Sequence, residues 1–313
     1  MSAEKLKECH DLIKPFINRT PVLRSGYLDS LLGSELYFKC ENFQEMGAYK
    51  IRGAVHAILK LPPDVRSLGV VTHSSGNFAQ ALSLAARRVG IRAYIAMPRT
   101  ASEFKKRAVL AYGGILEECE STFEGREAAA EAIRRRTGAT FIHPSDDLEV
   151  ILGQGTACME LLEEQADLDF IFVPVGGGGL LAGTAMAACF FGSQTKVIGG
   201  EPLEADDAFR SFYSGELQGN TTTNTIADGL KTQLGETSFP IILKYAHAIR
   251  RVTEPEILAA MRLLWERLKI TAEPSSAVAL AAVQNAQGEF KGKKIGVIIS
   301  GGNVDLDKLP FLA

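Results

Sequence analysis

The sequence predicts an α/β protein with parallel sheets, built as two packed lobes. Short β-rich runs alternate with helical patterns along almost the whole chain, and this alternation is typical of parallel sheets flanked by helices. Three of the expected strands run directly into glycine-containing polar turns. The chain has 313 residues, of which 46% are hydrophobic, which is enough for one large core or two moderate ones. We therefore expect two lobes.

Seven runs rich in β-branched and aromatic residues are the expected strands: 36–40, 69–73, 92–97, 141–143, 170–175, 196–200 and 294–300. Between them, residues 78–89 place apolar side chains at helical spacing on one face. Thr253 and Glu256 form a capping box with Pro255 in the first turn, and this predicts a helix that continues to Lys269. The polar region 213–236 is expected to be a loop that lines a site.

Composition excludes several classes of partner. A net charge of −3 and scattered basic residues give no positive field for nucleic acid or anionic lipid. The five cysteines lack CxxC spacing and are expected to be reduced thiols. The amino terminus lacks the apolar run of a signal peptide, and no stretch approaches the ~18 apolar residues of a membrane span. We expect a cytoplasmic protein with a small-molecule partner, no nucleic acid and no membrane.

The three glycine-containing turns follow the strand sequences VVTH, IFVPV and VIIS, as SSGN, GGGG and GGN. In open parallel sheets, ligands bind beyond the carboxyl ends of the strands. Glycines also close tight turns that bind nothing, and a single such turn would be explained in that way. Three turns of this kind favour one shared crevice.

The glycine run is the clearest candidate for an anion site. Its members are Gly176, Gly177, Gly178 and Gly179. They precede a good helix, LLAGTAMAA, so backbone N–H groups and the helix N-terminus can hold a phosphate. Gly177, Gly179, Ala182 and Glu201 also match a dinucleotide fingerprint, which leaves an NAD-dependent dehydrogenase as a remote alternative.

Lys50 is the candidate nucleophile, in the segment ENFQEMGAYKIRGA. A lysine that forms an imine must be partly desolvated so that its amine is neutral near pH 7, and the neighbours Tyr49 and Ile51 can provide such surroundings. Most lysines are solvated surface residues, and spacing alone leaves that alternative open.

Six motifs in order resemble the fold-type II pyridoxal-phosphate (PLP) enzymes, in particular the serine/threonine dehydratase and serine racemase branch: GAYKIRGA, HSSGN, VGGGGLL, TIADGL, AEPSSA and SGGNVDL. The resemblance covers almost the whole chain. It implies a tryptophan synthase β-like fold of two domains, each an open, mostly parallel sheet flanked by helices. Residues 1–68 and 144–313 would form the large PLP-binding domain, and 69–143 the small substrate-loop domain. A homodimer is usual in this family.

The resemblance also implies roles for individual residues. Lys50 would form the Schiff base with pyridoxal 5'-phosphate and take the α-proton, Tyr49 would pack beside the cofactor, and the four glycines would bind its phosphate. Asn77 would bind the phenolic oxygen and Ser300 would face the ring nitrogen. A hydroxyl there leaves the ring largely unprotonated, which favours rapid loss of a β-substituent. The substrate carboxylate would lie against the loop of Ser74, Ser75, Gly76 and Asn77.

The implied function is α,β-elimination of small β-hydroxy amino acids such as L-serine and L-threonine, giving 2-oxo acids and ammonia, with serine racemase activity. Ser75 would return a proton to the second face of the cofactor, or would only bind carboxylate. The segment CESTFEGRE resembles one in which an arginine, here Arg126, faces substrate. This favours the alternative of a 3-hydroxyaspartate dehydratase or aspartate-type racemase, unless Arg126 is a solvated helix charge. A binding module without turnover is the non-enzymatic alternative.

In GEPLEADD, Glu201, Ala205 and Asp207 resemble the family's site for Mg²⁺ or Ca²⁺, whose ligands are oxygen atoms. An acidic helix start is the alternative interpretation. Ala48 and Phe78 depart from the serine and histidine common in the family, and they make substrate identity less certain than reaction type. The sequence leaves open the ranking of serine, threonine and hydroxyaspartate, the balance of racemisation and elimination, nucleotide activation and the oligomeric state.

Overall fold

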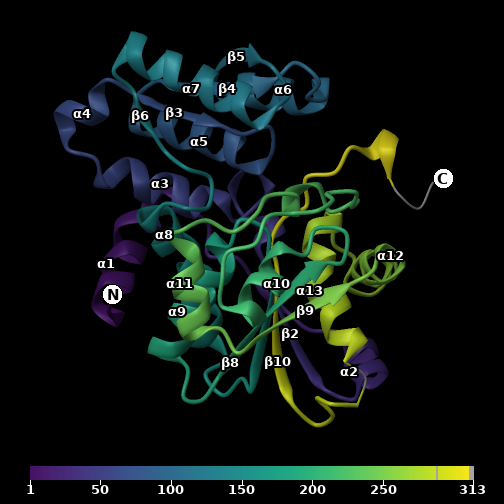
Figure 1. The fold of residues 1–313 in the computed structure, drawn as a ribbon. Helices are drawn as coiled ribbons and strands as arrows, with labels where there is room; N and C mark the ends of the chain where they lie inside the picture. The colour runs from purple at the N-terminus through teal and green to yellow at the C-terminus, as the bar shows by residue number, and fades with distance from the viewer. Residues whose placement is uncertain (287, 310–313) are drawn as a thin grey trace.

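The computed structural model describes residues 1–286 and 288–309. The chain forms two lobes, each built around its own sheet (Figure 1). The larger lobe holds a six-stranded sheet with the order β1 (Val22–Leu23), β2 (Glu35–Cys40), β10 (Lys294–Ile299), β7 (Phe170–Pro174), β8 (Lys196–Pro202) and β9 (Ala248–Val252). Its neighbouring strands pair in parallel, except that β1 runs antiparallel to β2.

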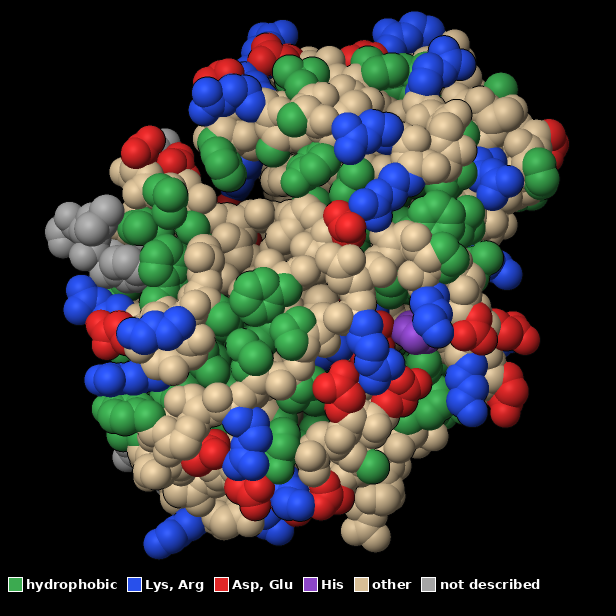
Figure 2. Space-filling view, turned by 180° about the vertical axis from the view of Figure 1, so that it is seen from behind, with side chains coloured by type: hydrophobic (Ala, Val, Ile, Leu, Met, Phe, Trp, Pro, Cys, Tyr) green, Lys and Arg blue, Asp and Glu red, His purple; other side chains and the backbone are tan. Residues whose placement is uncertain are grey.

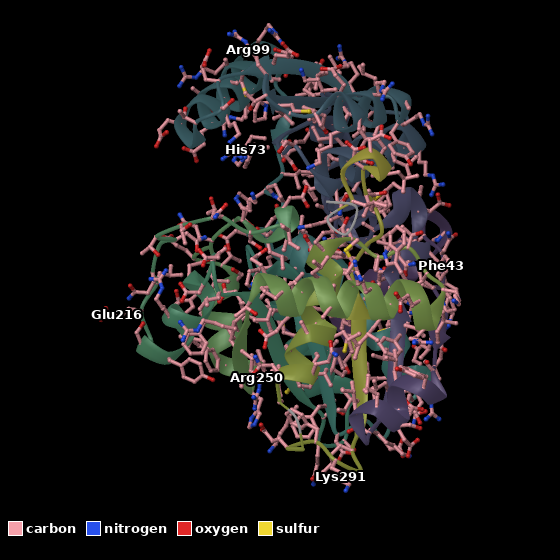
Figure 3. The ribbon with its side chains drawn as sticks, turned by 90° about the vertical axis from the view of Figure 1, so that its right-hand side faces the viewer. Phe43, His73, Arg99, Glu216, Arg250 and Lys291 are labelled. Atoms are coloured by element: carbon pink, nitrogen blue, oxygen red, sulfur yellow. The ribbon has the colours of Figure 1, made fainter. Side chains whose placement is uncertain are left out.

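The smaller lobe holds a four-stranded parallel sheet with the order β5 (Ile115–Cys119), β4 (Ala93–Pro98), β3 (Val70–His73) and β6 (Thr140–Phe141). These strands come from one continuous part of the chain, between β2 and β7 of the larger sheet. The molecular surface is hollowed where the lobes meet (Figure 2). His73, at the end of β3, lies on the side of the smaller lobe that faces the larger one (Figure 3).

Helices connect the strands, as parallel pairing requires. Those that lead into and through the smaller lobe are α3 (Lys50–Lys60), α4 (Pro63–Ser67), α5 (Asn77–Val89), α6 (Glu103–Ala111) and α7 (Phe123–Thr137). The larger lobe contains α1 (Ala3–Ile13), α2 (Gly26–Leu32), α8 (Leu148–Glu164), α9 (Gly179–Phe191), α10 (Asp207–Ser214), α11 (Ser238–Tyr245), α12 (Glu254–Leu263) and α13 (Pro274–Asn285). No helix of the described residues is long and apolar enough to cross a membrane.

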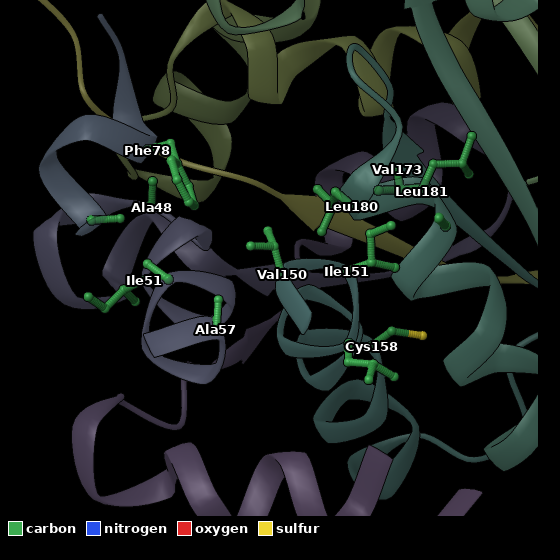
Figure 4. Packing of buried hydrophobic residues seen from close by; sticks show 14 of the residues in the cluster. Ala48, Ile51, Ala57, Phe78, Val150, Ile151, Cys158, Val173, Leu180 and Leu181 are labelled. Carbon is green, nitrogen blue, oxygen red and sulfur yellow. The ribbon is translucent and has the colours of Figure 1, made fainter. Parts of the chain in front are cut away.

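The larger sheet is buried on both faces, because its strands carry nearly continuous apolar runs. In β10, Val297 belongs to the core beneath α12 and α13, whereas the next residue, Ile298, belongs to the core shared with α8 and α9. The second of these cores also includes side chains of α3 and α5, so it extends from the larger lobe into the smaller one (Figure 4). One of the cores of the larger lobe is therefore continuous with the smaller lobe.

Glycines allow three helices to cross closely at the base of the site. A Cβ added at Gly153 of α8 would lie 2.5 Å from the Cα of Gly53 in α3. A Cβ added at Gly155 would lie 2.7 Å from the carbonyl oxygen of Gly183 in α9. Because side chains would hold these backbones apart, the glycines bring α3 and α9 against opposite sides of α8.

The structure departs from the predicted elements in a few places. Strands β1, β5 and β9 were not predicted, and the sequences of β5 (ILEEC) and β9 (AIRRV) explain the omission. Both lie at sheet edges, where polar side chains replace the apolar run of a central strand. The helix predicted after Pro255 is α-helical to Leu263 and continues as a π-helical turn before Lys269 adopts a left-handed conformation, with φ of 58°.

Candidate active site

Lys50 begins helix α3 and its amine faces the junction of the lobes. The Nζ atom donates a hydrogen bond to the carbonyl oxygen of Pro144 at 2.8 Å. It lies 5.1 Å from the ring centre of Tyr49 and 5.8 Å from that of Phe78. Burial lowers the pKa of Lys50 to about 8, although the negative charge of Glu273 acts in the opposite direction. This amine is therefore neutral far more often near pH 7 than a solvated lysine.

The backbone just before Lys50 pairs with the segment that contains Ser300. The Tyr49 N–H donates to the Ser300 carbonyl at 3.0 Å, and the Gly302 N–H donates to the Gly47 carbonyl at 2.9 Å. Ala48 and Gly301 form the antiparallel bridge between these bonds. Two sites predicted from distant motifs are thus joined directly by main-chain hydrogen bonds.

The four glycines form a tight turn at the N-terminus of α9. Gly178 has φ of 82°, a left-handed conformation that favours glycine. An added Cβ would lie 2.2 Å from Ser145 Oγ at Gly177, and 2.7 Å from the Ser145 carbonyl oxygen at Gly179. Only glycine fits these positions, and the N-terminal N–H groups of α9 suit a phosphate. The residues present therefore fit the phosphate group of pyridoxal phosphate.

Asn77 links the two lobes through its side chain. Its Nδ2 donates to both carboxylate oxygens of Glu273, at 2.9 and 3.2 Å, and its Oδ1 accepts a hydrogen bond from Asn303 Nδ2 at 2.9 Å. These partners fix which amide atom is the donor. Burial and the nearby charge of Asp228 raise the pKa of Glu273 to about 8. Neither Glu273 nor Asn303 was singled out in the sequence, although both lie in the motifs AEPSSA and SGGNVDL.

Of the predicted carboxylate loop, residues 74–76 lie between β3 and α5 with Gly76 as the N-cap, and Asn77 is the first residue of the helix. Ser74, Ser75 and Gly76 are all partly exposed, and the Gly76 N–H donates to Ser74 Oγ at 3.4 Å. A Cβ at Gly76 would meet no atom within 4 Å. The loop thus presents hydroxyls and helix N-terminal donors to open space, as an anion site requires.

Two histidines near this loop were missed in the sequence. The rings of His73 and His143 meet edge to face with their centres 5.9 Å apart. Nδ1 of His143 accepts hydrogen bonds from the backbone N–H groups of Ser145 and Asp146, so a neutral His143 carries its proton on Nε2. Burial, with the charges of His73 and Lys50, lowers the pKa of His143 to about 4. Its place at the end of the predicted strand 141–143 is the signal that could have identified it.

Arg126 lies at the end of the first turn of α7, partly exposed, with Nε donating to the Thr122 carbonyl at 3.3 Å. The pKa of His73 is lowered by burial and also by the positive charge of Arg126. His73, on which this charge acts, directly precedes the carboxylate loop.

Glu201 and Asp207 are both fully buried. The Glu201 carboxylate accepts hydrogen bonds from the N–H groups of Ala208 and Phe209, at 2.9 and 2.7 Å. Asp207 Oδ2 accepts from the Leu234 N–H at 2.7 Å, whereas Oδ1 has no hydrogen-bond partner among the described residues. Burial raises the pKa of both groups, that of Asp207 to about 6. Within the described ranges no group of three or more His, Cys, Asp or Glu side chains forms a metal cluster, so a cation here would need carbonyl ligands.

Arg52, two residues after Lys50 on α3, is the centre of a network of buried charged groups. Arg52 donates two hydrogen bonds to Glu41, at 2.7 and 2.8 Å, and two to Glu160, both at 2.8 Å. Lys39 Nζ donates to Glu160 at 2.8 Å, and His10 Nε2 lies 3.0 Å from the same carboxylate. These hydrogen bonds fix the first turn of α3 against α8 and against Glu41, the residue that follows β2.

Comparison with known proteins assigns the family. Residues 13–301 match the model of the family described as "Pyridoxal-phosphate dependent enzyme". This chain belongs to the pyridoxal-phosphate-dependent enzymes. The β-hydroxyaspartate dehydratase of Paracoccus denitrificans is 45% identical over 98% of both chains. The serine racemase of Dictyostelium discoideum is 47% identical, over 99% of this chain and 97% of its own. The structure of maize serine racemase is similar with a TM-score of 0.95 and 41% identity, covering 98% of this chain and 94% of that one.

Family membership confirms the predicted fold type and the PLP cofactor, and it makes this chain a PLP-dependent enzyme. The dinucleotide alternative loses its support on structural grounds as well. The carboxylate of Glu201, which that interpretation needs for a ribose, is fully buried and both its oxygens accept backbone N–H groups.

Proposed function

We propose that this enzyme dehydrates small β-hydroxy amino acids such as L-serine and L-threonine to 2-oxo acids and ammonia, and that it also racemises serine. The observation that carries the proposal is the placement of Lys50, an amine with a pKa lowered to about 8 whose backbone is joined to the Ser300 segment. The similarity to serine racemases and to a β-hydroxyaspartate dehydratase supports the same class of substrate.

The residues around Lys50 have separate tasks in this proposal. Bound pyridoxal phosphate supplies an electron-withdrawing ring that acidifies the α-hydrogen of an attached amino acid. Lys50 holds the cofactor through Nζ and later takes the α-proton. Residues Gly176–Gly179 bind the phosphate with backbone N–H groups, and the side chain of Tyr49 packs beside the ring. Asn77, oriented by Glu273 and Asn303, presents its amide to the phenolic oxygen.

Trapping with borohydride tests the role of Lys50. The purified protein should be yellow, and reduction should fix the cofactor to the peptide that contains Lys50. Lys50→Ala should abolish the colour and the turnover, whereas Lys60→Ala, at the exposed end of the same helix, should keep both. Trapping on another lysine, or turnover by Lys50→Ala, would contradict the proposal. Keto acid and D-amino acid should be followed with serine, threonine and 3-hydroxyaspartate, which ranks the substrates.

Ser75 is proposed as the donor that returns a proton from the second face. Ser75→Ala assayed with L- and D-serine should lose racemisation and D-serine use far more than L-serine dehydration. Ser74→Ala is the control, because a residue that only binds the carboxylate should lower all three activities together. If Ser75→Ala lost all three activities equally, as Ser74→Ala should, Ser75 would not be the proton donor.

A second candidate function is dehydration of 3-hydroxyaspartate, or an aspartate-type racemisation. Arg126 favours it, because its charge acts on His73 beside the carboxylate loop and could pair with a second carboxylate. Arg126→Met should then raise KM for 3-hydroxyaspartate by roughly 10- to 100-fold, as loss of a charge-assisted hydrogen bond would, and leave KM for serine nearly unchanged. Arg134→Met is the control, since Arg134 lies on the same helix and pairs with Glu131. Equal effects on both substrates would exclude this candidate.

We further propose that Mg²⁺ or Ca²⁺ binds Glu201, Asp207 and the Ala205 carbonyl, and that the chain is a cytoplasmic homodimer. The unpartnered Asp207 Oδ1 and the two buried carboxylates support the cation. The homodimer rests on the family resemblance, and light scattering after size exclusion tests it.

A further inference from the structure

Asp146 lies on the segment that leads from β6 back into the larger lobe, and its carboxylate reaches the start of α11. Its Oδ1 accepts hydrogen bonds from the backbone N–H groups of Thr237 and Ser238, at 2.9 and 2.8 Å. Thr237 is the N-cap of α11, but its own side chain makes no capping hydrogen bond. Asp146 therefore caps this helix from 91 residues away, and its negative charge suits the positive end of the helix.

Gly235 shows how closely this carboxylate is held. A Cβ added at Gly235 would overlap the carboxyl group of Asp146. Gly235 is not one of the glycines with a positive φ, so its backbone conformation would accept alanine. The contact with Asp146 is therefore the reason that glycine is needed at this position.

The start of α11 in turn packs on the glycine turn. A Cβ added at Gly178 would lie 2.6 Å from Ser238 Oγ and 2.7 Å from Cδ2 of Leu234, so both side chains lie directly against this glycine. The Ser238 hydroxyl is buried, and it shares its one proton between the carbonyl oxygens of Gly177 and Gly235, both at 3.3 Å. The position of the helix start thus sets one side of the glycine turn.

The segment that carries Asp146 also contacts the other side of the glycine turn and Lys50. Ser145 is buried, and its carbonyl oxygen would lie 2.7 Å from a Cβ added at Gly179. The Pro144 carbonyl accepts the hydrogen bond of Lys50 Nζ at 2.8 Å. Consecutive residues of one short segment therefore contact both the lysine and the glycine turn, which hold opposite ends of the cofactor.

We propose that Asp146 is a positioning residue that keeps the glycine turn at the distance from Lys50 that one cofactor molecule requires. This rests on the proposed binding of the phosphate by that turn. Asp146 acts through the start of α11 and not by contact with the cofactor. Its loss should release the helix start and weaken the hold on the phosphate, whereas the groups around the ring and Lys50 keep their own contacts.

The test compares the affinity of the apoprotein for two ligands. 5'-Deoxypyridoxal keeps the ring and the aldehyde of pyridoxal phosphate but lacks the phosphate. Asp146→Ala should weaken the affinity for pyridoxal phosphate roughly tenfold, the scale of a lost hydrogen bond to a charged group, and that for 5'-deoxypyridoxal less than about twofold. Asp146→Asn, whose amide oxygen can still cap the helix, should keep most of the affinity for pyridoxal phosphate. Asp147→Ala is the matched control, because Asp147 caps α8 instead, and it should leave the ratio of the two affinities unchanged.

A double variant with Gly235→Ala tests the contact itself. Gly235→Ala alone should displace the carboxylate and weaken the binding of pyridoxal phosphate, but added to Asp146→Ala it should cause no further loss, because the displaced group is already absent. Additive losses would overturn the role of this contact.

The two ligands also separate failure of this inference from failure of the phosphate site. Equal losses for both ligands in Asp146→Ala would overturn the positioning role of Asp146 alone. If the wild-type protein bound both ligands with the same affinity, the glycine turn would not bind phosphate, and this inference would fail with it. If Asp146→Ala does not fold, Gly235→Ala provides the same comparison, and an unchanged ratio of affinities there would overturn the proposal.

Discussion

Replacing Glu160 by glutamine tests the buried network that anchors the helix of Lys50. The Glu160 carboxylate accepts two hydrogen bonds from Arg52 and one from Lys39. Glutamine keeps the volume, but it has one acceptor oxygen and places an amide donor against these cations. Arg52 would keep its two hydrogen bonds to Glu41, whereas the buried amine of Lys39 would lose its carboxylate partner and keep the Thr20 carbonyl.

The magnitude follows from the burial of all four groups. Removing one partner from a buried ion pair costs about 3–5 kcal/mol. With an unfolding entropy of about 2.1 cal/mol/K per residue, the 313 residues give about 0.66 kcal/mol/K. The expected fall in Tm is therefore about 5–8 °C, accompanied by weaker retention of the cofactor.

The assay is thermal unfolding of the two apoproteins, with Glu163→Gln as the matched control. Glu163 lies one turn further along α8, is 46% exposed and pairs with Arg19, so its loss should cost less than about 1 kcal/mol. Hydrogen bonds and cations hold the pKa of Glu160 well below its usual 4.5, despite its burial. Its contribution is thus present above pH 4.5 and is lost as pH falls toward the lower folded pKa. A Tm for Glu160→Gln equal to that of the control at pH 7 would refute the reasoning.

Three further results are expected. In equilibrium titrations, Gly178→Ala should weaken cofactor affinity roughly tenfold, because φ is 82° and the added Cβ would lie 2.6 Å from Ser238 Oγ. Gly215→Ala is the control, since Gly215 also has a positive φ but has open space around it, and this variant should keep the affinity. The rate at which the apoprotein binds pyridoxal phosphate should rise with pH and level off near pH 8, where Lys50 becomes neutral. A rate that continued to rise up to pH 10.5 would count against this site. Mg²⁺ or Ca²⁺ should raise Tm more at pH 7 than at pH 5, since the pKa of Asp207 is about 6 and only its ionised form binds a cation. If the cation still raised the Tm of Asp207→Asn, this site would be excluded.

Local patterns predicted much of the framework. The seven expected apolar runs all form strands, although the run 141–143 gives a strand only at Thr140–Phe141. Apolar runs in central strands are read reliably because both faces of the sheet are buried. The edge strands β5 and β9 escaped prediction because polar residues are tolerated there.

By itself, the sequence determined the alternation of apolar strands with helices, the glycine turn and Lys50, because each depends on residues that are neighbours along the chain. Only the tertiary structure decided which side chains orient them. Asn77 meets Glu273 across 196 residues and Asn303 across 226. Such contacts depend on helix crossings and on the junction of two lobes, and no local periodicity encodes them. The chemistry at Lys50 could therefore be predicted from a motif, whereas the contacts that orient Asn77 required the fold.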